Sequence, residues 1–486
     1  PASPAPYVPM ARAPHLRLSI QSASGRRAGA LDLVQAVLAE QSAGRLPPGA
    51  RMPPVRALEH QLGISKNTVQ SAYDELCQRG MLEARSRAGV FVRQPDDYSP
   101  PAERDLSAPA PHLNSLAVDH QARLASSDTY LSAVFVDPEL LPHKQLSDCI
   151  RSVLSLPGLP TFYDAQGYPP LRELIAARLC ARGIRTSADE VLVTTGSQQA
   201  LDVVSRALAP RCIAFENPIY RYARLLFEAH NLRLVPLDLD PFESIDFATW
   251  ERDLANNRPG LMYAITSFQN PTGHSYSSHE LERLLELAQR LDFALLEDDW
   301  GSDMLSENDY RPSLRALGGE NVLYVNSFTK KLLPSLRLGY VLCSRAAMPA
   351  LLAAKRLATL GNATLMEAAL AEFLDRGYYD THLNRVQKAL DERYHACLDA
   401  LEELMPEGVR WTTPGGGPIL WLSVPDSVNL QALAARMAEQ HIRIELMPQA
   451  FVGRPHLHGF PIGYAFYPPE RLRAALECLS KELSRA

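Results

Sequence analysis

Seven short runs of apolar residues recur between residues 191 and 344, and stretches with helical spacing separate them. The runs are VLVTT, CIAFE, LRLVPLDL, LMYAITSF, FALLE, NVLYVNSF and GYVLCS. Strands that are covered on both faces read as nearly continuous apolar runs, whereas strands with one wet face alternate. The pattern therefore predicts an α/β domain with a parallel or mixed sheet, which we place at residues 115–486.

Residues 26–94 show a different pattern, which predicts a small and mainly helical domain. Gly63 ends one expected helix, and Ser65 follows it as the cap of the next. The expected elements are helices at 30–43, 54–62 and 65–79 and strands at 81–85 and 90–93. The positions expected to face the core are Leu31, Val34, Val37, Leu38, Val69, Ala72, Tyr73 and Leu76. This order of elements is typical of a helix-turn-helix followed by a wing.

The charge is distributed unevenly between these two regions. The chain has 49 Lys and Arg against 55 Asp and Glu, a formal net charge of −6. Residues 26–93 hold ten basic and six acidic residues, so this segment carries 10 − 6 = +4 and the rest carries −6 − 4 = −10. A basic first domain on an acidic body suggests a nucleic-acid-binding head.

The remaining segments narrow the class of protein. Residues 1–25 are rich in Pro, Ala and Ser and are expected to be disordered, and the proline-rich residues 95–114 are expected to form a linker. No apolar run is long enough for a membrane helix. The seven cysteines are scattered without a CxxC pair, which fits a cytoplasmic protein. No histidines show metal-ligand spacing, so we expect no metal site.

The start of the third expected helix carries polar side chains that suit DNA. Lys66, Asn67, Thr68 and Gln70 lie there and are expected to point outward. Lysine suits phosphate or guanine, and the amides of Asn and Gln suit adenine. The N-terminal residues of a recognition helix are those that reach base edges.

The segment LPPGARMPPVRALEHQLGISKNTVQSAYDELCQRGMLEARSRAGVFV resembles the winged helix-turn-helix of the GntR superfamily over nearly its whole length. The resemblance implies that Arg56, Lys66, Asn67 and Thr68 contact double-stranded DNA, and that Arg85 and the wing tip approach the minor groove. Arg87 stands where the wing of this family usually has its first glycine, and an arginine there can itself enter the groove.

In the larger domain, polar residues follow the ends of several expected strands. Gly196 and Ser197 come after VLVTT at the start of a helix, which suits an anion such as phosphate. Asn270 follows LMYAITSF, Asp298 follows FALLE, and Lys330 follows NVLYVNSF. A lysine, a buried carboxylate, an amide and an anion cradle are the parts that hold pyridoxal phosphate, whose aldehyde forms an imine with the lysine. Lys331 is the alternative reactive amine.

The motifs TTGSQQ, NPTG, EDD, SFTK and RLGY, in that order, resemble the fold-type I aminotransferases. The resemblance implies that Lys330 is the imine lysine and that Asp298 pairs with the pyridine nitrogen. It implies that Asn270 holds the phenolate oxygen and that Tyr220 flanks the ring. The phosphate-binding residues that it implies are Ser197, Gln198, Ser327, Thr329 and Arg337, with Tyr163 reaching in from a neighbouring subunit.

Two positions depart from the aminotransferase pattern. Trp300 stands where a tyrosine usually contacts the cofactor, so an indole N–H replaces the hydroxyl. Pro461 stands where an arginine usually binds the substrate carboxylate, which leaves Arg443, Arg454 or a ligand held in another way.

A GntR-like head, a linker and an aminotransferase-like body together resemble the MocR (GabR-like) regulators. The resemblance implies a transcriptional regulator that senses an amino-acid-like or cofactor-related effector at the pyridoxal phosphate site and forms a head-to-tail homodimer. The alternative is a working aminotransferase with an attached DNA-binding domain.

Overall fold

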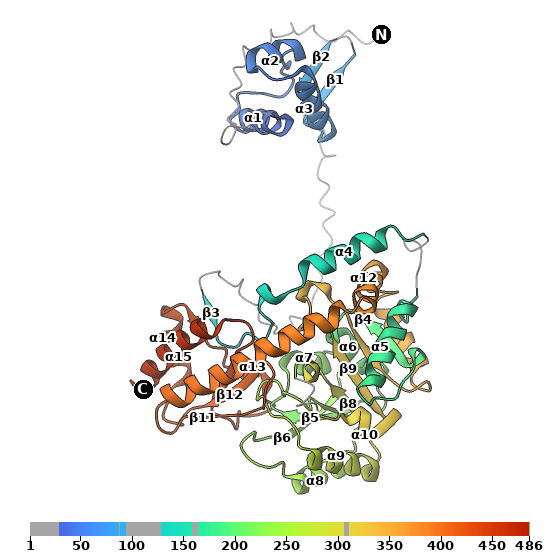
Figure 1. Cartoon of the computed structure of the whole chain (residues 1–486), viewed down its shortest axis with the longest axis vertical. Coiled ribbons are helices and arrows are strands. Elements are labelled where there is room, and N and C mark those ends of the chain that lie inside the picture. Colours follow the sequence, from blue (N-terminus) through green and yellow to red (C-terminus); the bar gives the residue numbers. More distant parts are fainter. Residues whose placement is uncertain (1–28, 87, 94–127, 158–163, 306–310, 486) are drawn as a thin grey trace, which may run out of the picture. The chain divides into compact units, whose positions relative to one another are not determined.

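The computed structural model describes residues 29–86, 88–93, 128–157, 164–305 and 311–485. The chain divides into two compact units, Pro1–Leu116 and Ala117–Ala486 (Figure 1). Four features of the sequence analysis lie outside the described residues: the segment 1–25, the linker 95–114, Tyr163 and Arg87.

The first unit has the expected winged helix-turn-helix architecture. Its elements are α1 (Ala30–Ser42), α2 (Val55–Leu62), α3 (Lys66–Gln78) and the antiparallel strands β1 (Leu82–Arg85) and β2 (Gly89–Val92) (Figure 1). Gly63 ends α2 in the left-handed conformation at φ 65°, which a residue without a Cβ adopts at little cost. Ser65 caps α3, and its Oγ accepts a hydrogen bond of 3.1 Å from the backbone N–H of Thr68.

The core of this unit differs from the expectation at α1. All four expected core residues of α3 are buried. In α1 the buried residues are Leu33, Val34 and Val37, whereas Leu31 is 63% exposed. Val34 and Val37 are buried as expected and Leu38 packs partly buried against the same core, but Leu31 was placed wrongly. Residues two apart on a helix point to nearly opposite sides, and Leu33 takes the side that packs against α3.

The second unit is built on a seven-stranded mixed sheet, as the apolar runs predicted. The strands are β4 (Val191–Thr194), β5 (Cys212–Asn217), β6 (Arg233–Asp238), β7 (Leu261–Ala264), β8 (Ala294–Asp298), β9 (Val322–Ser327) and β10 (Gly339–Leu342). Their order across the sheet is β4-β10-β9-β8-β7-β5-β6, and β10 runs antiparallel to both of its neighbours. The other pairs are parallel, so six strands end at the same edge of the sheet.

Helices cover both faces of this sheet, which explains why its strands show no polar alternation. Ile213 and Phe215 of β5 pack with α6 (Ser197–Ala207), α7 (Arg221–Ala229) and α11 (Met348–Ala358). Cys212 and Ala214 of the same strand pack with α8 (Phe247–Asn257) and α9 (Ser278–Leu291). The further helices beside the sheet are α4 (His143–Leu154), α5 (Pro169–Ala181), α10 (Leu314–Gly318) and α12 (Thr364–Asp375).

A smaller lobe completes this unit. Its antiparallel sheet contains β11 (Arg410–Trp411), β12 (Ile419–Ser423) and β14 (Gly459–Gly463), and a parallel pair contains β3 (Thr129–Tyr130) and β13 (Ile442–Arg443). Its helices are α14 (Leu430–Glu439) and α15 (Pro469–Leu483), and α13 (Tyr378–Leu404) is the long helix that leads into it. The short 3-10 turns are η1 (Pro138–Leu140), η3 (Ala188–Glu190), η4 (Ser302–Met304), η6 (Gly319–Asn321), η7 (Pro334–Leu336) and η8 (Pro448–Ala450).

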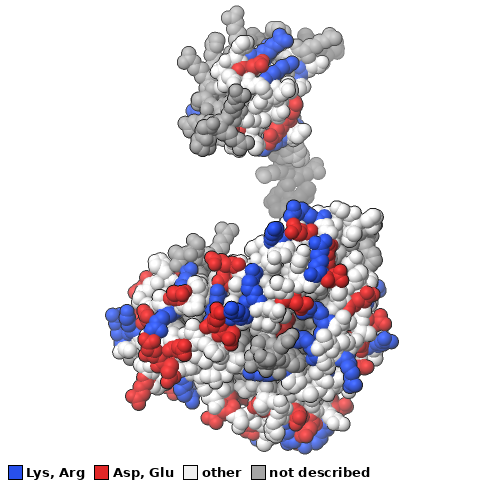
Figure 2. Space-filling view, in the orientation of Figure 1, with Lys and Arg blue, Asp and Glu red and all other residues white. Residues whose placement is uncertain are grey.

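The described residues contain neither a candidate membrane-spanning helix nor a candidate metal site. None of their helices combines the length and the apolar character needed to cross a membrane. They also contain no group of three or more His, Cys, Asp or Glu side chains that could hold a metal ion. Over the face of the larger unit shown in Figure 2, basic and acidic side chains lie interspersed.

Candidate cofactor site and DNA-facing helix

An anion cradle lies at the start of α6, where β4 ends. Gly196 has φ 89° and precedes the helix, so the positive end of the helix dipole faces this point. A Cβ at Gly196 would lie 3.3 Å from Nη2 of Arg337 and 3.5 Å from Oγ1 of Thr329. Thr329 Oγ1 is buried and has no hydrogen-bond partner within the described residues. A guanidinium, an unused hydroxyl and a helix N-terminus therefore converge on one place, which suits a phosphate group.

Two of the other expected phosphate-binding residues, Gln198 and Ser327, form side-chain hydrogen bonds with backbone groups of the protein. Ser197 is half-buried as the first residue of α6. The amide of Gln198 donates to the carbonyl O of Tyr222 at 3.1 Å. Ser327 Oγ donates to the carbonyl O of Leu338 at 3.3 Å and accepts from the N–H of Thr329 at 3.1 Å. In this arrangement the hydroxyl of Ser327 shapes the turn that presents Thr329.

Asp298 lies at the end of β8 with one oxygen satisfied and one not. The hydroxyl of Tyr263 donates to Oδ2 at 2.8 Å. Oδ1 is buried and has no hydrogen-bond partner within the described residues. Burial, together with the neighbouring Asp299, raises the pKa of Asp298 to about 7, although Tyr263 and Lys331 act in the opposite direction. A buried acceptor without a donor fits the N–H of a protonated pyridine ring.

Asn270 and Tyr220 lie in segments that other side chains hold in place. Asn270 is half-buried in the turn after β7. Gln269 fixes this turn, since its Nε2 donates to the carbonyl O of Pro218 at 2.6 Å and its Oε1 accepts from Thr272 Oγ1 at 2.6 Å. Tyr220 is half-buried before α7, and burial, followed by the nearby charge of Asp298, raises its pKa.

Lys330 lies half-buried beneath an aromatic ring. Its Nζ is 3.7 Å from the ring centroid of Phe135, a cation–π distance. Burial, with a smaller contribution from the charge of Arg337, lowers the pKa of Lys330 to about 8. Phe135 was missed at the sequence level, because a single aromatic residue outside any motif gives no signal of its position.

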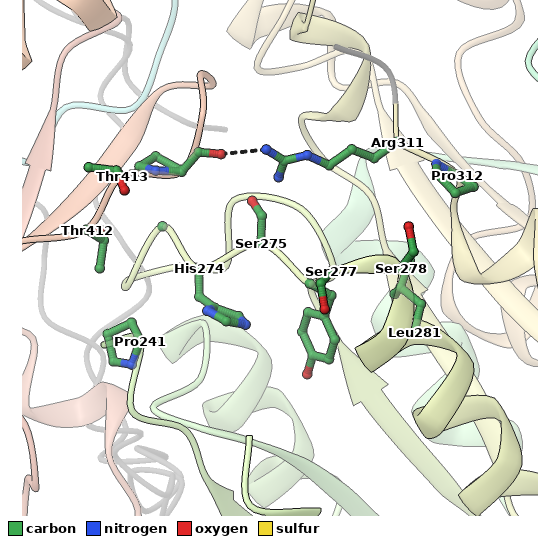
Figure 3. Close-up of a pocket in the computed structure, with 13 residues that line it drawn as sticks. Pro241, His274, Ser275, Ser277, Ser278, Leu281, Arg311, Pro312, Thr412 and Thr413 are labelled. Carbon is green, nitrogen blue, oxygen red and sulfur yellow. Dashed lines mark hydrogen bonds between the residues drawn. The ribbon is translucent and has the colours of Figure 1, made fainter. Parts of the chain in front are cut away.

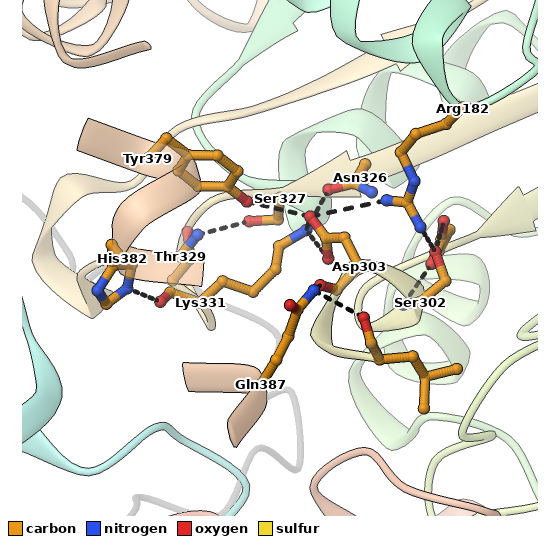
Figure 4. Close-up of polar contacts among 12 residues, drawn as sticks. Arg182, Ser302, Asp303, Asn326, Ser327, Thr329, Lys331, Tyr379, His382 and Gln387 are labelled. Atoms are coloured by element: carbon orange, nitrogen blue, oxygen red, sulfur yellow. Dashed lines mark hydrogen bonds and ion pairs between the residues drawn. The ribbon is translucent and has the colours of Figure 1, made fainter. Parts of the chain in front are cut away.

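Lys331 has a different environment, although it is the next residue. Its side chain is fully buried. Its Nζ lies 2.8 and 2.9 Å from the two carboxylate oxygens of Asp303 and donates to Oδ1 of Asn326 at 2.7 Å (Figure 4). The sequence left both lysines open as the reactive amine, and these contacts favour Lys330 because Lys331 is already held in an ion pair.

The indole N–H of Trp300 forms a hydrogen bond with a backbone carbonyl of the same chain. Trp300 is 7% exposed, and its Nε1 donates to the carbonyl O of Phe268 at 3.1 Å. The indole N–H is therefore used within the fold, and any contact of Trp300 with a cofactor would be made by the ring itself.

Arg443 and Arg454 are the two arginines that could bind a substrate carboxylate in place of the one missing at Pro461, and the structure describes both. Arg443 donates from Nε to Oδ2 of Asp128 at 2.7 Å, which ties it to the segment before β3. Arg454 is exposed in the segment before β14. Pro461 lies in β14 opposite Trp421 of β12, and its carbonyl O accepts from Ser132 Oγ at 3.3 Å.

A cavity of about 400 Å³ lies beside the residues that follow the Asn270 turn, from Gly273 onward (Figure 3). Residues 273–278, 311–312 and 412–414 line much of it. Arg311 spans it, donating from Nη2 to the carbonyl O of Pro414 at 2.9 Å. The hydroxyl of Thr412 donates to the carbonyl O of Thr272 at 2.9 Å, which ties this turn to the smaller lobe.

The expected DNA-contacting residues lie on the surface of the first unit. Arg56, Lys66 and Asn67 are exposed. Thr68 shares in the cap of α3, with its Oγ1 2.8 Å from Ser65 Oγ. Gln70 donates to Asp74 Oδ1 at 2.9 Å, a contact that spans one helical turn.

Arg85 is exposed on the first strand of the wing. It donates from Nε to Glu83 at 2.7 Å, and its guanidinium lies 4.6 Å from the ring centroid of Phe91. Of the expected DNA-contacting residues in the first turn of α3, Lys66 and Asn67 are exposed, whereas Thr68 takes part in the helix cap.

Two protein-family models match the chain. The aminotransferase class I and II model covers residues 141–476, and the model of bacterial regulatory proteins of the gntR family covers residues 30–92. The fold and the site thus define a protein that joins a GntR helix-turn-helix to an aminotransferase domain.

Known relatives share this organisation. The chain is 30% identical to the HTH-type transcriptional regulator TauR of Rhodobacter capsulatus, over 83% of this chain and 85% of TauR. It is 27% identical to the "Probable rhizopine catabolism regulatory protein MocR" of Rhizobium meliloti, over 92% of each chain. The chain therefore belongs to the aminotransferase class I and II family and, within it, to the MocR-type regulators that carry a GntR domain.

Solved aminotransferases share the fold of the larger unit. The α-aminoadipate aminotransferase LysN of Thermus thermophilus, complexed with N-(5'-phosphopyridoxyl)-L-leucine, has a TM-score of 0.69 and 28% identity, covering 75% of this chain and 95% of LysN. The kynurenine aminotransferase of Pyrococcus horikoshii has the same TM-score and 25% identity, covering 74% of this chain and 91% of that one.

Proposed function

We propose that this protein is a pyridoxal-phosphate-dependent, ligand-responsive transcriptional regulator that binds double-stranded DNA through α3 and its wing. The observation that carries the proposal is the pairing, in one chain, of a GntR head with an aminotransferase domain whose buried polar groups suit pyridoxal phosphate. Asp298 Oδ1 and Thr329 Oγ1, both buried without a partner in the described residues, fit the ring nitrogen and the phosphate of that cofactor.

The residues of this chain have distinct tasks in the proposal. The cofactor, when bound, supplies an aldehyde carbon with which an amine condenses and a ring that withdraws electrons. Lys330 provides the amine, and its lowered pKa leaves a larger neutral, nucleophilic fraction near pH 8 than an ordinary lysine has. Asp298 holds the ring nitrogen, and Asn270 and Tyr220 flank the ring.

The phosphate is assigned to Thr329, Arg337 and the start of α6, with Ser197, Gln198 and Ser327 beside them. With the cofactor bound, its aldehyde would offer the same chemistry to the amine of an effector, either amino-acid-like or related to the cofactor, as to Lys330. Lys330 would then have different contacts in the site with and without the effector. This gives the effector different interactions in two states of the protein, which regulation requires.

A working aminotransferase is the second candidate, and the presence of both Lys330 and Asp298 favours it. Pro461 in place of the usual arginine and the indole of Trp300 in place of the tyrosine hydroxyl argue against rapid turnover. A coupled assay with common amino acids and 2-oxo acids separates the two. Turnover of about 1 per second or faster, within the range of ordinary enzymes, would favour the enzyme.

We also propose that the protein acts as a head-to-tail homodimer. Leu357 and Leu360, at the end of α11 and just after it, are 86% and 74% exposed. Contiguous exposed apolar surface marks interaction sites, and these two leucines are three positions apart in the sequence. Changing both residues to Asp should convert a sedimenting dimer to a monomer, whereas Leu317→Asp, at a leucine that is 46% exposed in α10, should leave the dimer intact. A dimer that survives the double change would place the interface elsewhere.

The DNA interface predicts different effects for two neighbouring residues. Asn67→Ala should lower the preference for specific over random DNA by about 1–3 kcal/mol, because an amide reads adenine edges. Lys66→Ala should weaken binding to both DNAs and reduce the salt dependence by about one charge, as expected for a phosphate contact. Titrations of both variants at several salt concentrations test this. Equal losses on both DNAs for both variants would remove the base-reading role of Asn67.

A further inference from the structure

We propose that Lys331 is a positioning residue: by anchoring the turn of residues 328–332 to Asp303 and Asn326, it holds the neighbouring Lys330 in its half-buried place against Phe135. The importance of that place rests on the proposed function. The contacts themselves, and the measurement that tests them, do not depend on a cofactor.

The first support is the geometry of Lys331 itself. Nζ lies 2.8 and 2.9 Å from the two oxygens of Asp303 and 2.7 Å from Oδ1 of Asn326, which uses all three of its donors. A fully buried ammonium persists only where ion pairing and hydrogen bonds are this complete. The backbone of Lys331 is held as well, because its carbonyl O accepts from Nε2 of His382 at 2.7 Å.

The second support is that Asp303 is fixed from several elements at once (Figure 4). The hydroxyl of Tyr379 in α13 donates to its Oδ2 at 3.0 Å, and Nη1 of Arg182, which follows α5, lies 3.9 Å from the same oxygen. Gln387, also in α13, donates to its backbone carbonyl at 2.9 Å. Asn326 belongs to β9, so the anchor of Lys331 ties the turn to the sheet and to α13.

The charged groups that meet at this anchor are the carboxylate of Asp303 and the cations of Lys331 and Arg182. Burial acts to raise the pKa of Asp303, but Lys331 and Arg182 hold it below its usual value. Lys331 also opposes the rise in the pKa of Asp298. The other ionisable groups that face Asp303 are Tyr340, Tyr379 and, through the backbone of Lys331, His382, and burial keeps all three neutral near pH 7. Lys330 itself faces the cation of Arg337.

Loss of the anchor therefore has a directional consequence for Lys330. Burial is the larger cause of its lowered pKa, and the Arg337 cation is the smaller one. If the turn loosens, Lys330 moves into water and its pKa returns toward the ordinary lysine value of about 10.4. Loss of the Lys331 charge alone would act in the same direction, so Asn326→Ala, which keeps that charge, separates loss of the anchor from loss of the charge.

The composition of the chain makes the titration of Lys330 measurable. The sequence has seven lysines, so 13Cε-lysine NMR of the full, cofactor-free chain gives few signals to follow with pH. Lys355 is an internal control, because it is fully buried at a different place, where its Nζ donates to the carbonyl O atoms of Ala165 and Val193 at 2.6 Å each. Burial lowers its pKa to about 8 as well.

We expect Lys330 to titrate near pH 8 in the wild type. In Lys331→Met the midpoint of Lys330 should rise by about one unit or more toward the ordinary value, whereas the midpoint of Lys355 should stay unchanged. Lys331→Arg, which keeps the charge and the donors, should keep Lys330 near its wild-type midpoint.

Asn326→Ala serves as a milder variant if Lys331→Met fails to fold, in which case the signals of Lys330 and Lys355 move together. It removes one acceptor and leaves the ion pair, so it should raise the midpoint of Lys330 by a smaller amount. A Lys330 midpoint that stays at the wild-type value in either folded variant would overturn the proposal. Absence of cofactor binding in the wild type would contradict the proposed function and leave this result standing.

Discussion

Replacing Lys330 with alanine should abolish the covalent attachment of pyridoxal phosphate to the protein. Lys330 is the half-buried amine whose lowered pKa makes it nucleophilic near pH 8, whereas Lys331 is held by Asp303 and Asn326. Borohydride reduction of protein mixed with the cofactor, followed by peptide mass spectrometry, should place the adduct on Lys330 in the wild type. The Lys330→Ala protein should give none above background.

Lys331→Arg is the matched control for this experiment, because it changes the adjacent lysine but keeps its charge and donors. The adduct on Lys330 should persist in this variant. An adduct on Lys331 in the wild type, or none with excess cofactor, would contradict the assignment of the amine.

Asp298→Asn should weaken non-covalent binding of the cofactor by about 10- to 100-fold. A hydrogen bond to a charged group contributes about 1.5–3 kcal/mol, and about 1.4 kcal/mol corresponds to a tenfold change in affinity. The substitution keeps the size of the side chain but removes the negative charge that would hold a protonated ring nitrogen at Oδ1, which has no hydrogen-bond partner in the part of the chain that the structure describes. Equilibrium dialysis of the Lys330→Ala background, with and without Asp298→Asn, measures the effect apart from covalent attachment.

Tyr263→Phe provides a graded comparison in the same assay. It removes the hydroxyl that donates to Asp298 Oδ2 at 2.8 Å but leaves the carboxylate in place. Because that hydrogen bond favours the charged form of Asp298, its loss should weaken the cofactor by less than Asp298→Asn does. Wild-type affinity in Asp298→Asn would rule out a charge contact with the ring.

Much of the fold follows from local patterns in the sequence. The seven apolar runs coincide with the seven strands of the larger sheet, because a sheet covered by helices on both faces needs apolar side chains at every position. In the head, Gly63 and Ser65 mark the end of α2 and the start of α3, since both act within one turn of the chain. Signals of this kind depend on neighbouring residues alone.

The features that sequence reasoning missed depend on contacts between distant segments. Phe135 reaches Lys330 across nearly 200 positions, and Asp303 pairs with Lys331 from a different element. The indole donor of Trp300 is used by the carbonyl of Phe268, which no spacing rule could indicate. Leu31 was placed in the core because the helical period was read correctly but its phase was not, and the phase is set by packing against α3.

A ligand at the cofactor site should change the affinity of the protein for DNA. The affinity of the cofactor-loaded protein for DNA selected from a random pool is measured with and without each common amino acid, for the wild type and for Lys330→Ala. We expect at least one amino acid to change the wild-type affinity by about 5- to 150-fold, the usual range of coupling between two sites, and to leave Lys330→Ala unchanged. An unchanged wild-type affinity, with the same amino acids converted steadily to 2-oxo acids, would contradict the regulator and establish the aminotransferase.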